Sequence, residues 1–131
     1  MNFIHDGQVI FLDASSTVSG IVKYLSVFPN ITAITNSPKT SLRLAELRIK
    51  SFCTGGLLLE NSIAYVCTYA ENFIKNFNAD IFFFSSRGVS LNGTITDSSI
   101  EESDLRHTIL ANSKKNIFLC TSDKIGKYFF L

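Results

Sequence analysis

Two short, uninterrupted apolar runs constrain the fold of this chain more than any other feature. Residues 9–12 and 81–84 are each four consecutive apolar residues, and each run is followed by polar residues. Successive side chains of a strand point to opposite faces of a sheet, so such a run fits a strand that is covered on both faces. We therefore expect a parallel sheet, with the strand at 81–84 near its centre.

Amphipathic helical segments separate the predicted strands. Apolar residues at i, i+3, i+4 and i+7 predict helices over 18–25 and 70–77. Ser37 before Pro38 predicts a helix start, with that helix continuing to about residue 49. The order Ser99 to Glu102 is that of a capping box and predicts another helix.

Further strands are expected at 31–35, 51–54 and 116–120, and 57–59 could extend the third strand or begin another. An apolar segment from residue 128 begins one more element and then stops, as it would in a C-terminally truncated domain. Strands that alternate with helices predict an α/β fold with a mostly parallel sheet and helices on both faces.

Composition and charge exclude several classes of protein. A chain of 131 residues with 46% hydrophobic residues can form one globular domain without a disulfide or metal. The net charge is +1 and the basic residues are scattered, so this segment alone should bind DNA poorly. Three cysteines and two histidines without metal-ligand spacing indicate no metal or cofactor. Without a membrane-spanning run or signal peptide, we expect a cytoplasmic protein with no membrane partner.

Polar loops after the predicted strands are the main functional signal, because the carboxyl ends of parallel strands meet at one edge of a sheet. The first two loops also begin helices, where hydroxyls and backbone N–H groups can bind a phosphate. Two glycines after the third strand allow a ligand to approach the backbone. Ordinary helix capping and a tight turn remain alternatives for each loop taken singly.

Charged side chains complete this set of candidates. Arg87, which precedes Gly88, offers a guanidinium suited to phosphate, and Lys124 adds a point charge. Glu102 has its capping-box position as a structural alternative. The candidate ligand-binding residues are Asp13, Ser15, Ser16, Thr17, Thr35, Asn36, Ser37, Gly55, Gly56, Arg87, Gly88, Glu102 and Lys124. We expect the phosphate at the helix starts of 15–17 and 36–37.

Taken in order, these motifs resemble the C-terminal effector-sensing domain of DeoR-type bacterial transcriptional repressors, over residues 1–131. The segments that carry the resemblance are 5–17, 35–37, 54–56, 78–84, 87–89, 93–96, 100–106 and 122–126. The resemblance implies the fold of ribose-5-phosphate isomerase and coenzyme A transferases. It also implies a non-enzymatic sensor that binds a sugar phosphate or related metabolite. DNA would be bound only by a winged helix-turn-helix domain absent from these residues, and the full-length protein would be a homo-oligomer.

Two other interpretations stay open at this point. A sugar-phosphate isomerase could use the same fold, with Asp13, Asp80, Glu102 or Lys124 as acid and base. The acidic motifs typical of ribose-5-phosphate isomerases are not evident, which favours the sensor. A purely structural dimerisation module would bind no small molecule and would leave the polar loops unexplained.

Overall fold

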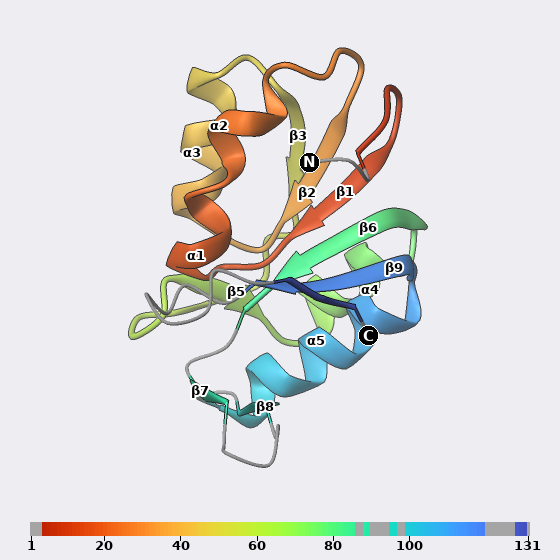
Figure 1. Ribbon diagram of the computed structural model, residues 1–131. Helices are drawn as coiled ribbons and strands as arrows, with labels where there is room; N and C mark the ends of the chain where they lie inside the picture. Colours follow the sequence, from red (N-terminus) through yellow and green to blue (C-terminus); the bar gives the residue numbers. More distant parts are fainter. Residues whose placement is uncertain (1–3, 86–87, 90–94, 97–98, 120–127, 131) are drawn as a thin grey trace.

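The computed structural model describes residues 4–85, 88–89, 95–96, 99–119 and 128–130 (Figure 1). Its centre is a six-stranded sheet in the order β10-β9-β6-β1-β2-β3. Five neighbouring strands are parallel, namely β1 (Val9–Leu12), β2 (Thr32–Thr35), β3 (Lys50–Cys53), β6 (Ala79–Phe84) and β9 (Ser113–Leu119). The edge strand β10 (Tyr128–Phe130) pairs antiparallel with β9. The mostly parallel α/β sheet is therefore confirmed.

Helices cover both faces of the sheet, as the apolar runs predict. Figure 1 shows α1 (Ser16–Ser19), α2 (Val22–Leu25) and α3 (Pro38–Glu46) on one side, and α4 (Thr68–Ile74) and α5 (Ile100–Ala111) on the other. Along β6, Ile81 and Phe83 belong to the core cluster beneath α1–α3, whereas Phe82 and Phe84 belong to the cluster beneath α4 and α5. Strand β6 lies between β9 and β1, which confirms its central place.

The helix predicted over 18–25 is divided into two short helices. Its apolar stripe is correct, since Val18, Val22 and Leu25 are fully buried. Around Gly20, however, the hydrogen bonds tighten to the i−3 pattern, and the Ile21 N–H donates to the Val18 carbonyl at 3.0 Å. Glycine is a poor helix former, so the division falls where propensity is lowest.

Two other helices end earlier than their sequence patterns predict. Helix α3 ends at Glu46 instead of residue 49, because Arg48 adopts a positive φ of 58° and the Ile49 N–H donates to the Leu44 carbonyl at 3.0 Å. This is the hydrogen bond of a Schellman cap, formed without the glycine that usually announces one. Helix α4 ends at Ile74 instead of residue 77.

Two short hairpins lie outside the main sheet. The run at 57–59 forms β4 (Leu57–Leu59), which pairs antiparallel with β5 (Ala64–Val66), a strand that the sequence analysis does not predict. The other hairpin pairs β7 (Gly88–Val89) with β8 (Ile95–Thr96). The last parallel strand begins at Ser113, earlier than the expected residue 116, and Cys120 lies outside the described residues.

Candidate functional site

The loop after β1 is organised by the carboxylate of Asp13. Its Oδ1 accepts hydrogen bonds from the Ser15 N–H at 2.9 Å and the Ser15 hydroxyl at 2.6 Å. Its Oδ2 accepts from the Ser85 N–H at 2.7 Å. Ser15 in turn caps α1 by accepting from the Val18 N–H at 3.1 Å. Asp13 thus joins the loops that follow β1 and β6, two neighbouring strands of the sheet.

Burial raises the pKa of Asp13 from 3.8 to about 6. The hydrogen bonds from the Ser15 hydroxyl and from the Ser85 and Ser15 N–H groups act in the opposite direction, as does the charge of Arg106. Desolvation outweighs them, so this carboxyl group changes its charge close to neutral pH. Ionisable groups with such displaced pKa values gather at functional sites.

The loop after β2 caps α3 and contacts the β4–β5 hairpin. The Ser37 hydroxyl accepts from the Thr40 N–H at 3.1 Å, which confirms the predicted cap. The Asn36 carbonyl accepts from the Tyr65 N–H at 2.8 Å, and the Asn36 Nδ2 donates to the Tyr65 carbonyl at 3.1 Å. Thr35 is fully buried beneath this turn, where its hydroxyl accepts from the Ser37 N–H at 3.1 Å.

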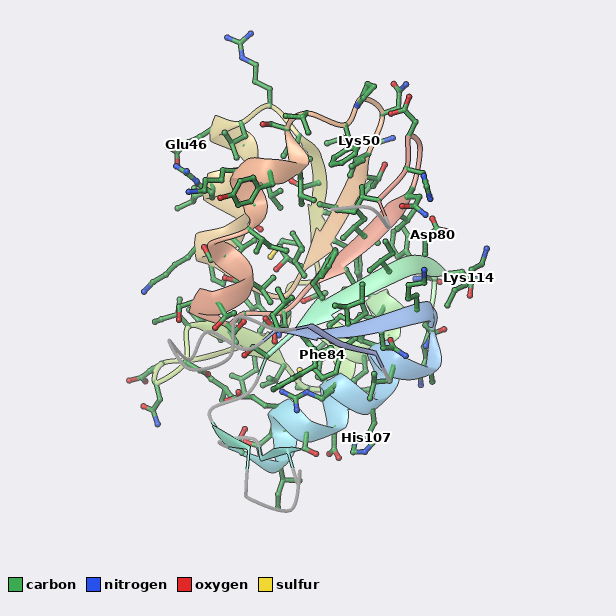
Figure 2. All side chains as sticks on the ribbon, in the orientation of Figure 1. Glu46, Lys50, Asp80, Phe84, His107 and Lys114 are labelled. Carbon is green, nitrogen blue, oxygen red and sulfur yellow. The ribbon has the colours of Figure 1, made fainter. Side chains whose placement is uncertain are left out.

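Helix α5 supplies two charged side chains that are four residues apart and therefore share one face. The Ser99 hydroxyl accepts from the Glu102 N–H at 3.1 Å, as the capping pattern predicts. The Glu102 carboxylate accepts from the Ser62 hydroxyl at 3.1 Å. Arg106 donates from Nη2 to the Ser85 carbonyl at 2.7 Å, and its guanidinium carbon lies 5.2 Å from the ring centre of Phe84. Figure 2 shows Phe84 between the sheet and α5.

These segments enclose a cleft of about 610 Å³ at the carboxyl ends of the parallel strands. Seven of the predicted residues line it: Asp13, Ser15, Ser16, Thr17, Asn36, Ser37 and Glu102. The remaining polar wall includes Lys39, Thr40, Asn61, Ser62, Ser85 and Arg106, and the apolar part includes Phe82, Leu105 and Ile109. The loops that the sequence places at one edge of the sheet do meet there.

Of the other six predicted ligand residues, four are described but are not among the residues that line the cleft, and two lie outside the described residues. Thr35, Gly55 and Gly56 are outside the cleft lining. Gly56 has a φ of 115°, and a Cβ added there would stand 2.6 Å from the Val66 carbonyl oxygen. Its backbone therefore packs against β5 instead of opening a path for a ligand. Gly88 pairs with Thr96 in the β7–β8 hairpin. Arg87 and Lys124 lie outside the described residues.

Some cleft residues were not predicted as ligand residues, and the strength of their local sequence signal differs. Arg106 follows Glu102 by one helical turn, so the spacing of the two residues places Arg106 on the same face of α5 as Glu102. Lys39 and Thr40 stand in the first turn of α3, directly after a correctly predicted cap. Asn61 and Ser62 come from the turn of the β4–β5 hairpin, whose second strand the sequence analysis does not predict.

The acidic residues considered for an isomerase are not all at this cleft. Asp80, near the start of β6, accepts from the Val9 N–H at 2.8 Å and lies 3.6 Å from the Lys114 ammonium. Figure 2 shows Asp80 and Lys114 close together at the end of the sheet where β6 begins. Asp13 directly follows the last residue of β1 and therefore lies at the opposite end of the sheet. The structure thus separates Asp80 from Asp13 and Glu102.

Two kinds of feature are absent from the described part of the chain. No group of three or more His, Cys, Asp or Glu side chains is placed to hold a metal ion there. No helix in the same part combines the length and the apolar character that crossing a membrane requires.

Comparisons with known proteins give consistent results. The family model described as the DeoR C terminal sensor domain matches residues 1–131. The HTH-type transcriptional regulator GolR of Listeria innocua is 32% identical over 124 residues, covering 94% of this chain and 49% of that protein. GlpR of Haloferax volcanii is 25% identical, and the match covers 96% of this chain and 49% of that protein. The L-fucose operon activator of Escherichia coli is 29% identical, and the match covers 95% of this chain and 51% of that protein. The chain spans about half the length of these relatives.

Solved structures resemble the fold of this chain. A ribose 5-phosphate isomerase from Plasmodium falciparum matches with a TM-score of 0.63 and 17% identity, covering 93% of this chain and 46% of the other. A D-ribose-5-phosphate isomerase in complex with phospho-erythronic acid matches with a TM-score of 0.61 and 18% identity, with 90% and 46% covered. At this level of identity the likeness shows a shared fold, which confirms the expected fold of ribose-5-phosphate isomerase.

Proposed function

The chain belongs to the family of DeoR C-terminal sensor domains, and on that premise we propose that its cleft binds a sugar phosphate or a related phosphorylated metabolite. Binding then controls how a helix-turn-helix domain of the whole protein recognises its operator. The names of the relatives support this proposal, since they describe transcriptional regulators and an activator of a sugar operon.

The observation that carries the proposal is the mixture of groups in one cleft of about 610 Å³. Lys39 and Arg106 are cations, the serine and threonine hydroxyls at the two helix starts are neutral donors, and Asp13 and Glu102 are acceptors. Cations and hydroxyls suit a phosphoryl group, whereas carboxylates suit sugar hydroxyls. The volume is within the usual range for sites that enclose a small ligand.

The position of the cleft supports a sensing role. Its walls come from the loops after β1, β2 and β6, from α5, and from the turn of the β4–β5 hairpin. A ligand that contacts all of these segments favours the arrangement in which they stand closest. Because a ligand can shift a conformational equilibrium only through different affinities for its two states, these contacts are where the signal arises.

We propose binding without turnover. The likeness to ribose-5-phosphate isomerases extends to the fold, and Asp80 is remote from the carboxylates of the cleft. Incubation of the purified chain with ribose 5-phosphate is expected to form no ribulose 5-phosphate. Formation of that product at a rate proportional to protein concentration contradicts this part of the proposal.

The binding proposal is tested by thermal unfolding with sugar phosphates and with their unphosphorylated parents. A ligand that binds only the folded state stabilises it by about 2.7 kcal/mol at a hundred times its Kd. The expected result is a concentration-dependent rise in Tm with at least one sugar phosphate and a much smaller rise with its parent sugar. No rise with any sugar phosphate, or equal rises with and without the phosphoryl group, refutes the proposal.

A pair of lysine variants locates the binding. Lys39→Ala removes a cation from the cleft wall, and we expect it to weaken sugar-phosphate binding by about tenfold, as the loss of a charge-assisted hydrogen bond does. Lys75→Ala removes the same charge beyond the end of α4, away from the cleft lining, and serves as the matched control. Equal effects of the two substitutions on affinity argue for long-range attraction instead of contact.

A further inference from the structure

Two buried oxygen atoms in the wall of the cleft have no hydrogen-bond partner among the described residues. They are the Asn36 Oδ1 and the Thr40 Oγ1, which belong to two residues of the cleft lining. Asn36 is only 6% exposed and Thr40 only 1%, so bulk water does not easily replace the missing partners. Buried polar atoms in folded proteins are almost always hydrogen-bonded. Both atoms have almost no accessible surface, so a ligand in the cleft completes their bonding by turning these side chains towards it as it binds.

The chemistry of the missing partner follows from how Asn36 is held. Its Nδ2 donates to the Tyr65 carbonyl, and its own carbonyl accepts from the Tyr65 N–H. A carbonyl oxygen accepts hydrogen bonds and cannot donate them, so Tyr65 must face the amino group of the Asn36 carboxamide. The unpaired Oδ1 is consequently an acceptor, and only a donor can satisfy it.

This requirement distinguishes the two ends of a sugar phosphate. An ionised phosphoryl oxygen is an acceptor and leaves the Asn36 Oδ1 unpaired, whereas a sugar hydroxyl donates to it. The Thr40 hydroxyl, in the first turn of the helix that follows Asn36, can either donate to or accept from a sugar hydroxyl. The initial expectation that Asn36 helps to hold the phosphate is thus less compatible with the structure than a contact to the sugar.

We propose that Asn36 and Thr40 form a specificity site that recognises a hydroxyl group of the sugar, so the phosphoryl group binds elsewhere in the cleft. This inference rests on the proposed function, because it assigns an orientation to the ligand proposed there. A site built to bond a hydroxyl discriminates against compounds that lack one, since its buried polar atoms are then left unpaired.

The test compares ribose 5-phosphate, fructose 6-phosphate and inorganic phosphate as probes, with affinities measured by calorimetry. Thr40→Val replaces the unpaired hydroxyl with a methyl group of similar shape and keeps the backbone N–H that Ser37 caps. Asn36→Leu removes the unpaired oxygen together with the bond to Tyr65. The control is Ser41→Ala, because the Ser41 hydroxyl is also buried and unpaired but does not line the cleft.

We expect Thr40→Val and Asn36→Leu to weaken the better-binding sugar phosphate by about tenfold, while inorganic phosphate binds as before. Ser41→Ala should leave both affinities unchanged. Unliganded Thr40→Val should melt no lower than the wild-type chain, because the lost hydroxyl has no bond to lose.

Two outcomes separate this inference from the proposed function. If the wild-type chain binds a sugar phosphate and neither substitution changes its affinity, or both weaken inorganic phosphate equally, the inference is overturned and the proposed function stands. If the wild-type chain binds neither probe and no other sugar phosphate raises its Tm in the thermal-unfolding series, the two proposals fail together.

Discussion

The raised pKa of Asp13 predicts how the stability of the chain depends on pH. The carboxylate is partly buried in the cleft wall, and its pKa is about 6 in the folded chain against 3.8 for an ordinary aspartate. The perturbation is Asp13→Asn, which removes the ionisable group from the same position. Comparison of the variant with the wild-type chain at each pH isolates the titration of this one residue, because contributions of other groups common to both chains cancel.

The sign and the magnitude follow from proton linkage. Between pH 4 and pH 6 the folded chain retains the Asp13 proton that the unfolded chain has released, so raising the pH favours unfolding. A separation of roughly two pH units corresponds to about 3 kcal/mol, since each unit is 1.36 kcal/mol. The stabilising contribution of the protonated group is complete below pH 4 and is lost as the pH passes 6. As the pH rises from 4 to above 6, the free energy of unfolding of the variant should therefore increase relative to that of the wild-type chain by up to about 3 kcal/mol.

Urea unfolding at half-unit steps from pH 4 to pH 7.5 measures this difference. The loss of hydrogen bonds to Ser15 and Ser85 offsets the Asp13→Asn curve by a constant amount and does not change its slope. Asp104→Asn on the exposed part of α5 controls for the loss of one negative charge. A difference between wild type and Asp13→Asn that is constant with pH, or that grows in favour of the wild type at high pH, refutes the reasoning.

Three further predictions concern packing and capping. Gly56→Ala should lower the free energy of unfolding by about 2–5 kcal/mol, because its Cβ would stand 2.6 Å from the Val66 carbonyl oxygen at a φ of 115°. Gly55→Ala, with no atom within 4 Å of its Cβ, should cost only about 1–2 kcal/mol of backbone strain, and equal losses at the two glycines in urea unfolding would contradict the packing role. Ser37→Ala should cost about 1 kcal/mol through the lost cap of α3, visible as a lower urea midpoint. Leu44→Ala should cost about 2–5 kcal/mol by leaving a cavity beneath α3, and a loss below 1 kcal/mol would show that the core there collapses freely.

Local signals in the sequence predicted much of the fold. The caps at Ser37 and Ser99 and the apolar runs were correct because each depends on residues within one helical turn or one strand. The end of α3 and the β4–β5 hairpin were not predicted. Both use non-glycine residues at positive φ, with 58° at Arg48 and 50° at Ile63, and such residues give no warning in a sequence.

The candidate site was also predicted only in part, because local signals locate some of its residues and not others. Ser15, Ser16 and Thr17 reached the cleft because they directly follow a strand whose end the sequence locates. Asn61 and Ser62 reached it through a hairpin whose path depends on packing against the rest of the molecule. Gly56, although also adjacent to a strand, was turned towards Val66 by the same hairpin.

Local geometry along the chain is enough to predict that the central strands are covered on both faces and that the polar loops meet at one edge of the sheet. Both follow from the alternation of side chains along a strand and from the common direction of parallel strands. Which polar groups become partners depends instead on how distant segments pack together. Glu102 meets Ser62 from 40 residues away, and Asp13 meets Ser85 from 72 residues away. These contacts, the burial that raises the pKa of Asp13, and the unpaired oxygens of Asn36 and Thr40 all arise where separate segments pack together. Burial and partnership are properties of that packing, and no single segment carries them.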